Sequence, residues 1–171
     1  MSPAREQAVA NAVTLARVPL AIAVALTLDR PAWALALAAA AALSDAADGR
    51  IARHAKARGS TSTAGDWLDP VADKVFVAIA ATALAVHLGA WLVLALVAAR
   101  ELAMVALAPL AWRHRAHLPR RASTLGKVTT DAQFATIVAL IVYAPAALPL
   151  AVATAALGLA ATIGYARRAI S

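Results

Sequence analysis

Apolar residues in this chain come in long runs, separated by short stretches of polar and charged residues. The runs cover approximately residues 9–28, 32–53, 66–87, 90–112, 127–144 and 147–166. Each is close to the ~20 residues that an α-helix needs to cross the hydrocarbon core of a bilayer. The pattern therefore predicts an all-α, polytopic membrane protein with six transmembrane helices in a single domain, residues 1–171.

The connections between these runs differ in charge. The short connections at residues 29–31, 87–89 and 145–149 hold one basic residue, Arg30. The N-terminus, the two longer connections and the C-terminal tail hold twelve: Arg5, Arg50, Arg53, Lys56, Arg58, Arg113, Arg115, Arg120, Arg121, Lys127, Arg167 and Arg168. Because Lys and Arg are enriched on the cytoplasmic side of a membrane, we expect both termini and both long connections in the cytoplasm.

The composition supports a membrane protein and excludes any chemistry that depends on cysteine. The 171 residues are 63% hydrophobic with a mean hydropathy of +0.73, more apolar than a typical soluble domain. The absence of cysteine excludes disulfides, a thiolate nucleophile and Cys-ligated metals. The net charge of +7 would suggest a nucleic-acid partner in a soluble protein. Here the basic residues follow the membrane topology, so we expect no nucleic-acid partner.

Acidic residues gather where the second and third apolar runs meet. Of nine in the chain, five lie between residues 45 and 73: Asp45, Asp48, Asp66, Asp69 and Asp73. On helices, Asp45 and Asp48 share one face, and so do Asp69 and Asp73. Four carboxylates brought together need protons or cations to neutralise them, and oxygen ligands suit a hard cation such as Mg²⁺. The spacing therefore predicts a divalent cation site.

The same aspartates could instead be ordinary charges at helix ends. Asp66, for example, could cap the N-terminus of the third helix. The presence of two face-sharing pairs, with the small residues Gly49, Ala52 and Gly65 beside them, favours the cation site.

Other polar residues interrupt the apolar runs at helical spacing. Asn11, Thr14 and Arg17 share one face of the first run, and Arg100 and Glu101 lie in the middle of the fourth. Polar groups inside a membrane are costly unless they line a cavity or pair within the bundle. Arg17 could alternatively extend to the membrane surface. For Arg100 and Glu101, an internal ion pair and a ligand contact both remain open.

Residues 45–73 resemble the signature of the CDP-alcohol phosphotransferases, membrane enzymes of phospholipid synthesis. That signature reads D-x2-D-G-x2-A-R, a spacer, then G-x3-D-x3-D, and all eight defining residues occur here in order. The spacer, residues 54–64, has eleven residues and is longer than usual in the family. Further strings, including Gly126-Lys127-x2-Thr130-x2-Gln133, resemble the bacterial phosphatidylglycerophosphate synthases and the related cardiolipin synthases.

The resemblance implies roles for individual residues. Mg²⁺, or alternatively Mn²⁺, would be held by Asp45, Asp48 and Asp69, and Asp73 would be the catalytic base and a further metal ligand. The CDP-linked donor would contact Asp48, Gly49, Ala52, Arg53 and Gly65. A phosphorylated acceptor would need several cations, and the candidates are Lys127, Arg100, Arg17, Arg113 and Arg121.

The resemblance also implies the reaction. A phosphatidyl group would pass from CDP-diacylglycerol to an alcohol, with release of CMP, in a homodimer of the cell (inner) membrane whose active site faces the cytoplasm. Glycerol 3-phosphate is the leading acceptor, and phosphatidylglycerol or an inositol or polyol phosphate are alternatives. Remote alternatives are an Mg²⁺-dependent intramembrane prenyltransferase, which lacks the Gly-x2-Ala-Arg element, and a cation or proton transporter, whose acidic residues would span several depths.

Overall fold

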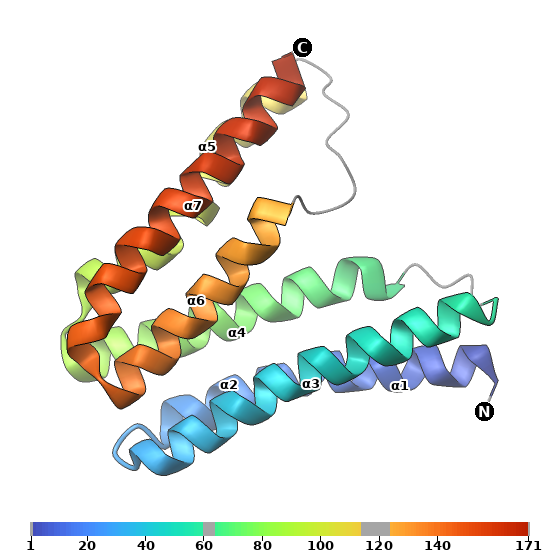
Figure 1. Cartoon of the computed structure of the whole chain (residues 1–171), viewed down its shortest axis with the longest axis horizontal. Coiled ribbons are helices and arrows are strands. Elements are labelled where there is room, and N and C mark those ends of the chain that lie inside the picture. The colour runs from blue at the N-terminus through green and yellow to red at the C-terminus, as the bar shows by residue number, and fades with distance from the viewer. Residues whose placement is uncertain (1, 60–63, 114–123, 171) are drawn as a thin grey trace. The chain divides into compact units, whose positions relative to one another are not determined.

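The computed structural model describes residues 2–59, 64–113 and 124–170, which form helices joined by short turns (Figure 1). The helices are α1 (Pro3–Leu15), α2 (Arg17–Leu26), α3 (Pro31–Ala57), α4 (Ala64–Leu88), α5 (Trp91–Arg113), α6 (Thr124–Val142) and α7 (Ala144–Ile170). These ranges contain no β-strand, so the all-α prediction is confirmed for them. The helix ends lie within a few residues of the apolar runs, except in the first run.

The first run is divided into two helices at Ala16. The backbone N–H of Ala16 still donates to the carbonyl of Ala12 at 3.1 Å. Pro19, however, has no N–H to donate to the carbonyl of Leu15, because its nitrogen is part of the ring. The missing hydrogen bond accounts for the division of the run just before Pro19. As a result, Thr14 lies in the last turn of α1 and Arg17 is the first residue of α2.

Several helices are long and apolar enough to cross a membrane. Among the described residues these stretches are Arg5–Leu26, Val71–Leu88, Thr124–Val142 and Ala144–Gly164. Large apolar side chains are exposed along them, such as Leu26, Val86 and Val152. Exposed side chains of this kind suit contact with lipid, so the structure supports a multi-pass membrane protein. The six-span count and the cytoplasmic position of the termini stay predictions.

The chain divides into two compact units, Met1–Leu84 and Ala85–Ser171, and each is described separately. The predicted single domain is not tested by this division. In the first unit, α3 packs along both α1 and α2. Ala21, Ala34, Ala38 and Ala41 are fully or almost fully buried there. Small side chains allow helix backbones to approach closely in membrane proteins.

In the second unit, α7 packs against both α5 and α6. The hydroxyls of Thr136 on α6 and Thr154 on α7 lie 3.2 Å apart and are buried. A Cβ atom added to Gly158 of α7 would lie 2.7 Å from Cβ of Arg100 on α5. Glycine at this position therefore sets how closely α5 and α7 approach.

Candidate active site

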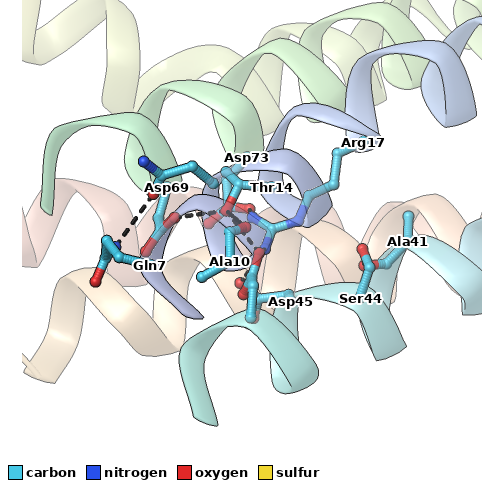
Figure 2. A network of polar contacts seen from close by, with 11 residues as sticks. Gln7, Ala10, Thr14, Arg17, Ala41, Ser44, Asp45, Asp69 and Asp73 are labelled. Carbon is cyan, nitrogen blue, oxygen red and sulfur yellow. Dashed lines mark hydrogen bonds and ion pairs between the residues drawn. The ribbon is translucent and has the colours of Figure 1, made fainter. Parts of the chain in front are cut away.

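A group of polar side chains lies within the first unit, and each of the helices α1 to α4 contributes to it (Figure 2). We call this group the carboxylate cluster. Its members are Thr14, Arg17, Asp45, Asp48, Asp69 and Asp73. Figure 2 shows the labelled aspartates gathered around Thr14 and Arg17. The two aspartate pairs that share helix faces in the sequence thus meet in one place.

Arg17 connects three of these aspartates, and none of its side chain is exposed. Its Nη2 lies 2.9 Å from Oδ1 of Asp45 and also donates to Oδ2 of Asp48. Its Nη1 donates to Oδ1 of Asp73. A guanidinium carries several N–H donors in a fixed plane, so it can hold carboxylates from two helices at once. Arg17 thereby joins α3 to α4.

Thr14 makes a second connection between the same helices. Its Oγ1 lies 2.7 Å from Oδ2 of Asp48 on α3 and 2.8 Å from Oδ1 of Asp69 on α4. It also lies 3.1 Å from the carbonyl oxygen of Ala10. A hydroxyl has one proton and can donate to one of these three acceptors at a time. At any time, therefore, at least one of the two carboxylate oxygens receives no hydrogen bond from the Thr14 hydroxyl.

The cluster contains more negative than positive charge. Ionised, its four carboxylates face the one guanidinium of Arg17. Asp48 is only 2% exposed, and its Oδ1 is buried without a hydrogen-bond partner. A buried carboxylate oxygen without a partner is costly. Asp45 is 55% exposed, so the cluster is open to its surroundings on that side.

These features fit a divalent hard cation. The donors are carboxylate oxygens, one buried oxygen has no partner, and positive charge is in deficit. As the described side chains are arranged, with Arg17 among them, no three Asp, Glu or His side chains lie close enough together to hold a metal ion. Arg17 lies among the carboxylates and engages one oxygen each of Asp45, Asp48 and Asp73.

The candidate donor-binding residues follow the cluster along α3. Gly49 and Ala52 are half-buried, and Arg53 is exposed. A Cβ atom on Gly49 would lie 3.3 Å from Nη1 of Arg53, so the missing side chain leaves room for the guanidinium to lie back along the helix. Gly65 falls in the first turn of α4, but its surroundings lie outside the described residues.

Of the candidate acceptor-binding residues, Arg17 belongs to the carboxylate cluster. Lys127 is exposed near the start of α6, and Arg100 is half-buried on α5, both in the second unit. Arg113 ends α5 with a side chain outside the described structure, and Arg121 lies outside the described residues altogether. Whether these five cations meet at one acceptor stays a prediction.

Arg100 has a protein partner in the second unit. Its Nη1 lies 3.4 Å from Oε1 of Glu101, and the Nε atom of Arg100 is buried without a hydrogen-bond partner. Gln133 of α6 donates from Nε2 to Oε2 of Glu101 at 3.1 Å and to the carbonyl of Val97 at 2.9 Å. The internal ion pair that the sequence left open is therefore present, although long.

Two contacts could not be derived from the sequence pattern. The sequence places Thr14 and Arg17 on one helix face, but it does not identify the aspartates as their partners. The signal available was that a cation within an apolar run needs an anionic partner. The ion pair between Glu6 of α1 and Arg58, just after α3, with Nη1 to Oε1 at 2.7 Å, had no signal in the spacing.

Comparisons with known proteins agree with the signature. The sequence profile of the family described as CDP-alcohol phosphatidyltransferase matches residues 7–163, which include the whole carboxylate cluster. Two proteins named CDP-diacylglycerol–glycerol-3-phosphate 3-phosphatidyltransferase, from Sodalis glossinidius and Yersinia enterocolitica, are each 40% identical over 108 residues.

Each of these two matches covers 59% of this chain and 56% of the relative, so the chain spans about half the length of the curated relatives it matches. No solved structure matches the chain significantly. The profile match, in contrast, extends over most of the sequence. On that match, this chain belongs to the CDP-alcohol phosphatidyltransferase family.

Proposed function

We propose that the protein transfers a phosphatidyl group from CDP-diacylglycerol to glycerol 3-phosphate and releases CMP. The observation that carries this proposal is the carboxylate cluster, in which aspartates of α3 and α4 meet with negative charge in excess. The names of the two relatives, from Sodalis glossinidius and Yersinia enterocolitica, support the same donor and acceptor.

The proposed cofactor is Mg²⁺, with Mn²⁺ as an alternative, held by Asp45, Asp48 and Asp69. When bound, a divalent cation would neutralise charge on the donor's diphosphate and on the departing CMP. The buried Oδ1 of Asp48 supports this assignment, because it lacks a hydrogen-bond partner. Arg53, exposed on α3 beside Gly49, is assigned to the donor's diphosphate, for which a guanidinium is well suited.

Asp73 is the proposed general base. It is 20% exposed, and Arg17 engages its Oδ1, which leaves Oδ2 as the oxygen that we assign to the proton. The acceptor hydroxyl loses its proton to Asp73, and its oxygen forms a new bond to the phosphatidyl phosphorus. The bond between that phosphorus and the CMP oxygen breaks, and CMP leaves with the bonding electrons. Orienting and deprotonating the hydroxyl is the protein's own contribution.

Recognition of the acceptor phosphate is assigned to Lys127, Arg100 and Arg17, with Arg113 and Arg121 in addition. Phosphatidylglycerol and an inositol or polyol phosphate are the alternative acceptors. We further propose six membrane spans, a homodimer, and an active site facing the cytoplasm from the cell membrane. The concentration of basic residues in two connections and both termini supports this orientation.

CMP release by the protein purified in detergent tests the proposal. With CDP-diacylglycerol and Mg²⁺ present, we expect glycerol 3-phosphate to give the fastest release, and excess EDTA to abolish it. An Asp29→Asn variant, changed in the turn between α2 and α3, serves as the matched control and keeps the wild-type rate. If CMP were released only with a different alcohol, that alcohol and not glycerol 3-phosphate would be the acceptor. No release with any alcohol would contradict it.

A further inference from the structure

The carboxylate cluster already contains a cation of the protein's own. Arg17 is the largest fully buried side chain described, and its two terminal nitrogens reach three aspartates. A buried arginine in such a position is stabilised by the carboxylates around it, and they are stabilised by it. Arg17 therefore holds together a group of negative charges that would otherwise repel one another.

Arg17 and a divalent cation would use the same carboxylates. The guanidinium engages Oδ1 of Asp45 and Oδ2 of Asp48, both of which belong to assigned metal ligands. Thr14 meanwhile lies between Asp48 and Asp69, and Oδ1 of Asp48 is buried without a partner. The described arrangement thus satisfies only part of the cluster. Because Arg17 already holds one oxygen of Asp45 and one of Asp48, a metal entering the cluster would compete with its guanidinium for these carboxylates.

Arg17 lies where two helices of the chain meet. Arg17 is the first residue of α2, directly after the helix break at Ala16. Its Nε atom is buried without a hydrogen-bond partner, so the carboxylates hold the guanidinium through its terminal nitrogens. Pro19 has no N–H for the carbonyl of Leu15, so the backbone beside Arg17 has one helical hydrogen bond fewer than a continuous helix.

We propose that Arg17 is a tethered counter-ion, which neutralises the carboxylate cluster when no metal is bound and gives up its carboxylate contacts to the entering divalent cation. The inference rests on the proposed metal-dependent function. It predicts that Arg17 and the metal compete, so Arg17 lowers the apparent affinity of the cluster for Mg²⁺. When the metal binds, the guanidinium of Arg17 would leave its carboxylates and become available to bind an anionic group.

Thermal unfolding of the full chain in detergent, titrated with Mg²⁺, tests the competition. Without metal, Arg17→Gln should unfold at a lower temperature than wild type, because the four carboxylates lose their counter-ion. With Mg²⁺, the variant should gain more stability than wild type and reach half of its gain at about tenfold lower Mg²⁺ concentration. An equal or higher half-saturating concentration in the variant would overturn the proposal.

Arg58→Gln is the matched control. It removes the arginine of the ion pair between Glu6 of α1 and Arg58, in the same unit but outside the carboxylate cluster. We expect it to lower the unfolding temperature and to leave the half-saturating Mg²⁺ concentration at the wild-type value. If both variants shifted that concentration equally, the effect would be general electrostatics and the proposal would fail.

Arg17→Lys keeps the test decisive if Arg17→Gln does not fold. Lysine retains the charge but lacks the planar fork, so it should compete less and give a half-saturating concentration between those expected for wild type and Arg17→Gln. A value at or above wild type would contradict competition. If wild type shows neither stabilisation by Mg²⁺ nor Mg²⁺-dependent CMP release, the proposed function fails as well. If it shows both, the proposed function stands, and the Arg17 variants test the tethered counter-ion alone.

Discussion

At the scale of single residues, the carboxylate cluster depends on two hydrogen-bond donors, the Thr14 hydroxyl and the Arg17 guanidinium, and each faces three acceptor groups. Thr14 faces a backbone carbonyl and two carboxylate oxygens with one proton, and Arg17 faces three carboxylates with one charge. Because buried carboxylates without partners are costly, removing either donor should have a measurable effect. Thr14 is the clearer case, since its loss changes no formal charge.

Thr14→Val should destabilise the protein and slow the reaction. Valine has a similar shape but no hydroxyl, so Asp48 and Asp69 lose their shared donor and repel each other more strongly. Loss of one partner of a buried hydrogen-bonded carboxylate costs about 1–3 kcal/mol. The unfolding temperature and the rate of CMP release should both decrease. Thr14→Ser restores the hydroxyl and should recover most of both values. Failure of serine to rescue would assign the effect to packing.

Asp73→Asn tests the assignment of the general base. Asparagine keeps the size of the side chain and can still contact Arg17, but it cannot accept the proton of the acceptor hydroxyl. We expect the rate of CMP release to decrease by about 10²–10⁴-fold, the usual contribution of a general base. Binding of CDP-diacylglycerol, measured separately, should stay close to wild type. A variant that turns over at the wild-type rate would show that Asp73 is not the base.

At the scale of helices, the sequence predicted most of what the structure contains, and physical reasons explain the rest. Long apolar runs bounded by charged or Pro-containing turns specify helices directly, so α3 to α7 begin and end close to prediction. The i, i+3 and i, i+4 spacing predicted which aspartates share a face. It did not predict that Arg17 would pair with them, because contacts between helices depend on how the helices pack.

Gly158→Ala should destabilise the second unit, although alanine is the better helix former. The added Cβ would lie 2.7 Å from Cβ of Arg100 and 3.3 Å from Cγ2 of Thr129. Cβ of Arg100 is fixed by its backbone, so no change of rotamer removes the contact and α5 must move away from α7. Overpacking of this kind costs about 1–3 kcal/mol, compared with about 1 kcal/mol gained in helix propensity.

The unfolding temperature of Gly158→Ala, measured in detergent, is the readout. Ala160→Leu is its control, because it adds a larger side chain two residues further along α7 at an exposed position. We expect the control to unfold at nearly the wild-type temperature. An unchanged or raised unfolding temperature in Gly158→Ala would mean that α5 and α7 can separate without cost.

At the scale of the whole molecule, the membrane spans and their proposed orientation are argued from the amino-acid sequence, not from the arrangement of the two units. Four stretches of the described residues have the length and apolar composition of membrane spans, and this property does not depend on how the units are arranged. The proposed orientation in the membrane rests instead on the distribution of Lys and Arg between the connections. The proposed cytoplasmic active site depends on that orientation, because the nucleotide of the proposed donor would reach the carboxylate cluster from the cytoplasm.

Single cysteines can test the orientation without background, since the chain contains no cysteine of its own. Ser2 is exposed before α1, and Leu88, which is 46% exposed, ends α4. With six spans and a cytoplasmic N-terminus, these two positions lie on opposite sides of the membrane. A membrane-impermeant maleimide added to intact spheroplasts should label Leu88→Cys and should label Ser2→Cys only after permeabilisation. Labelling of both positions from one side would contradict the six-span topology. The reverse pattern would place the N-terminus outside the cytoplasm and contradict the proposed cytoplasmic active site.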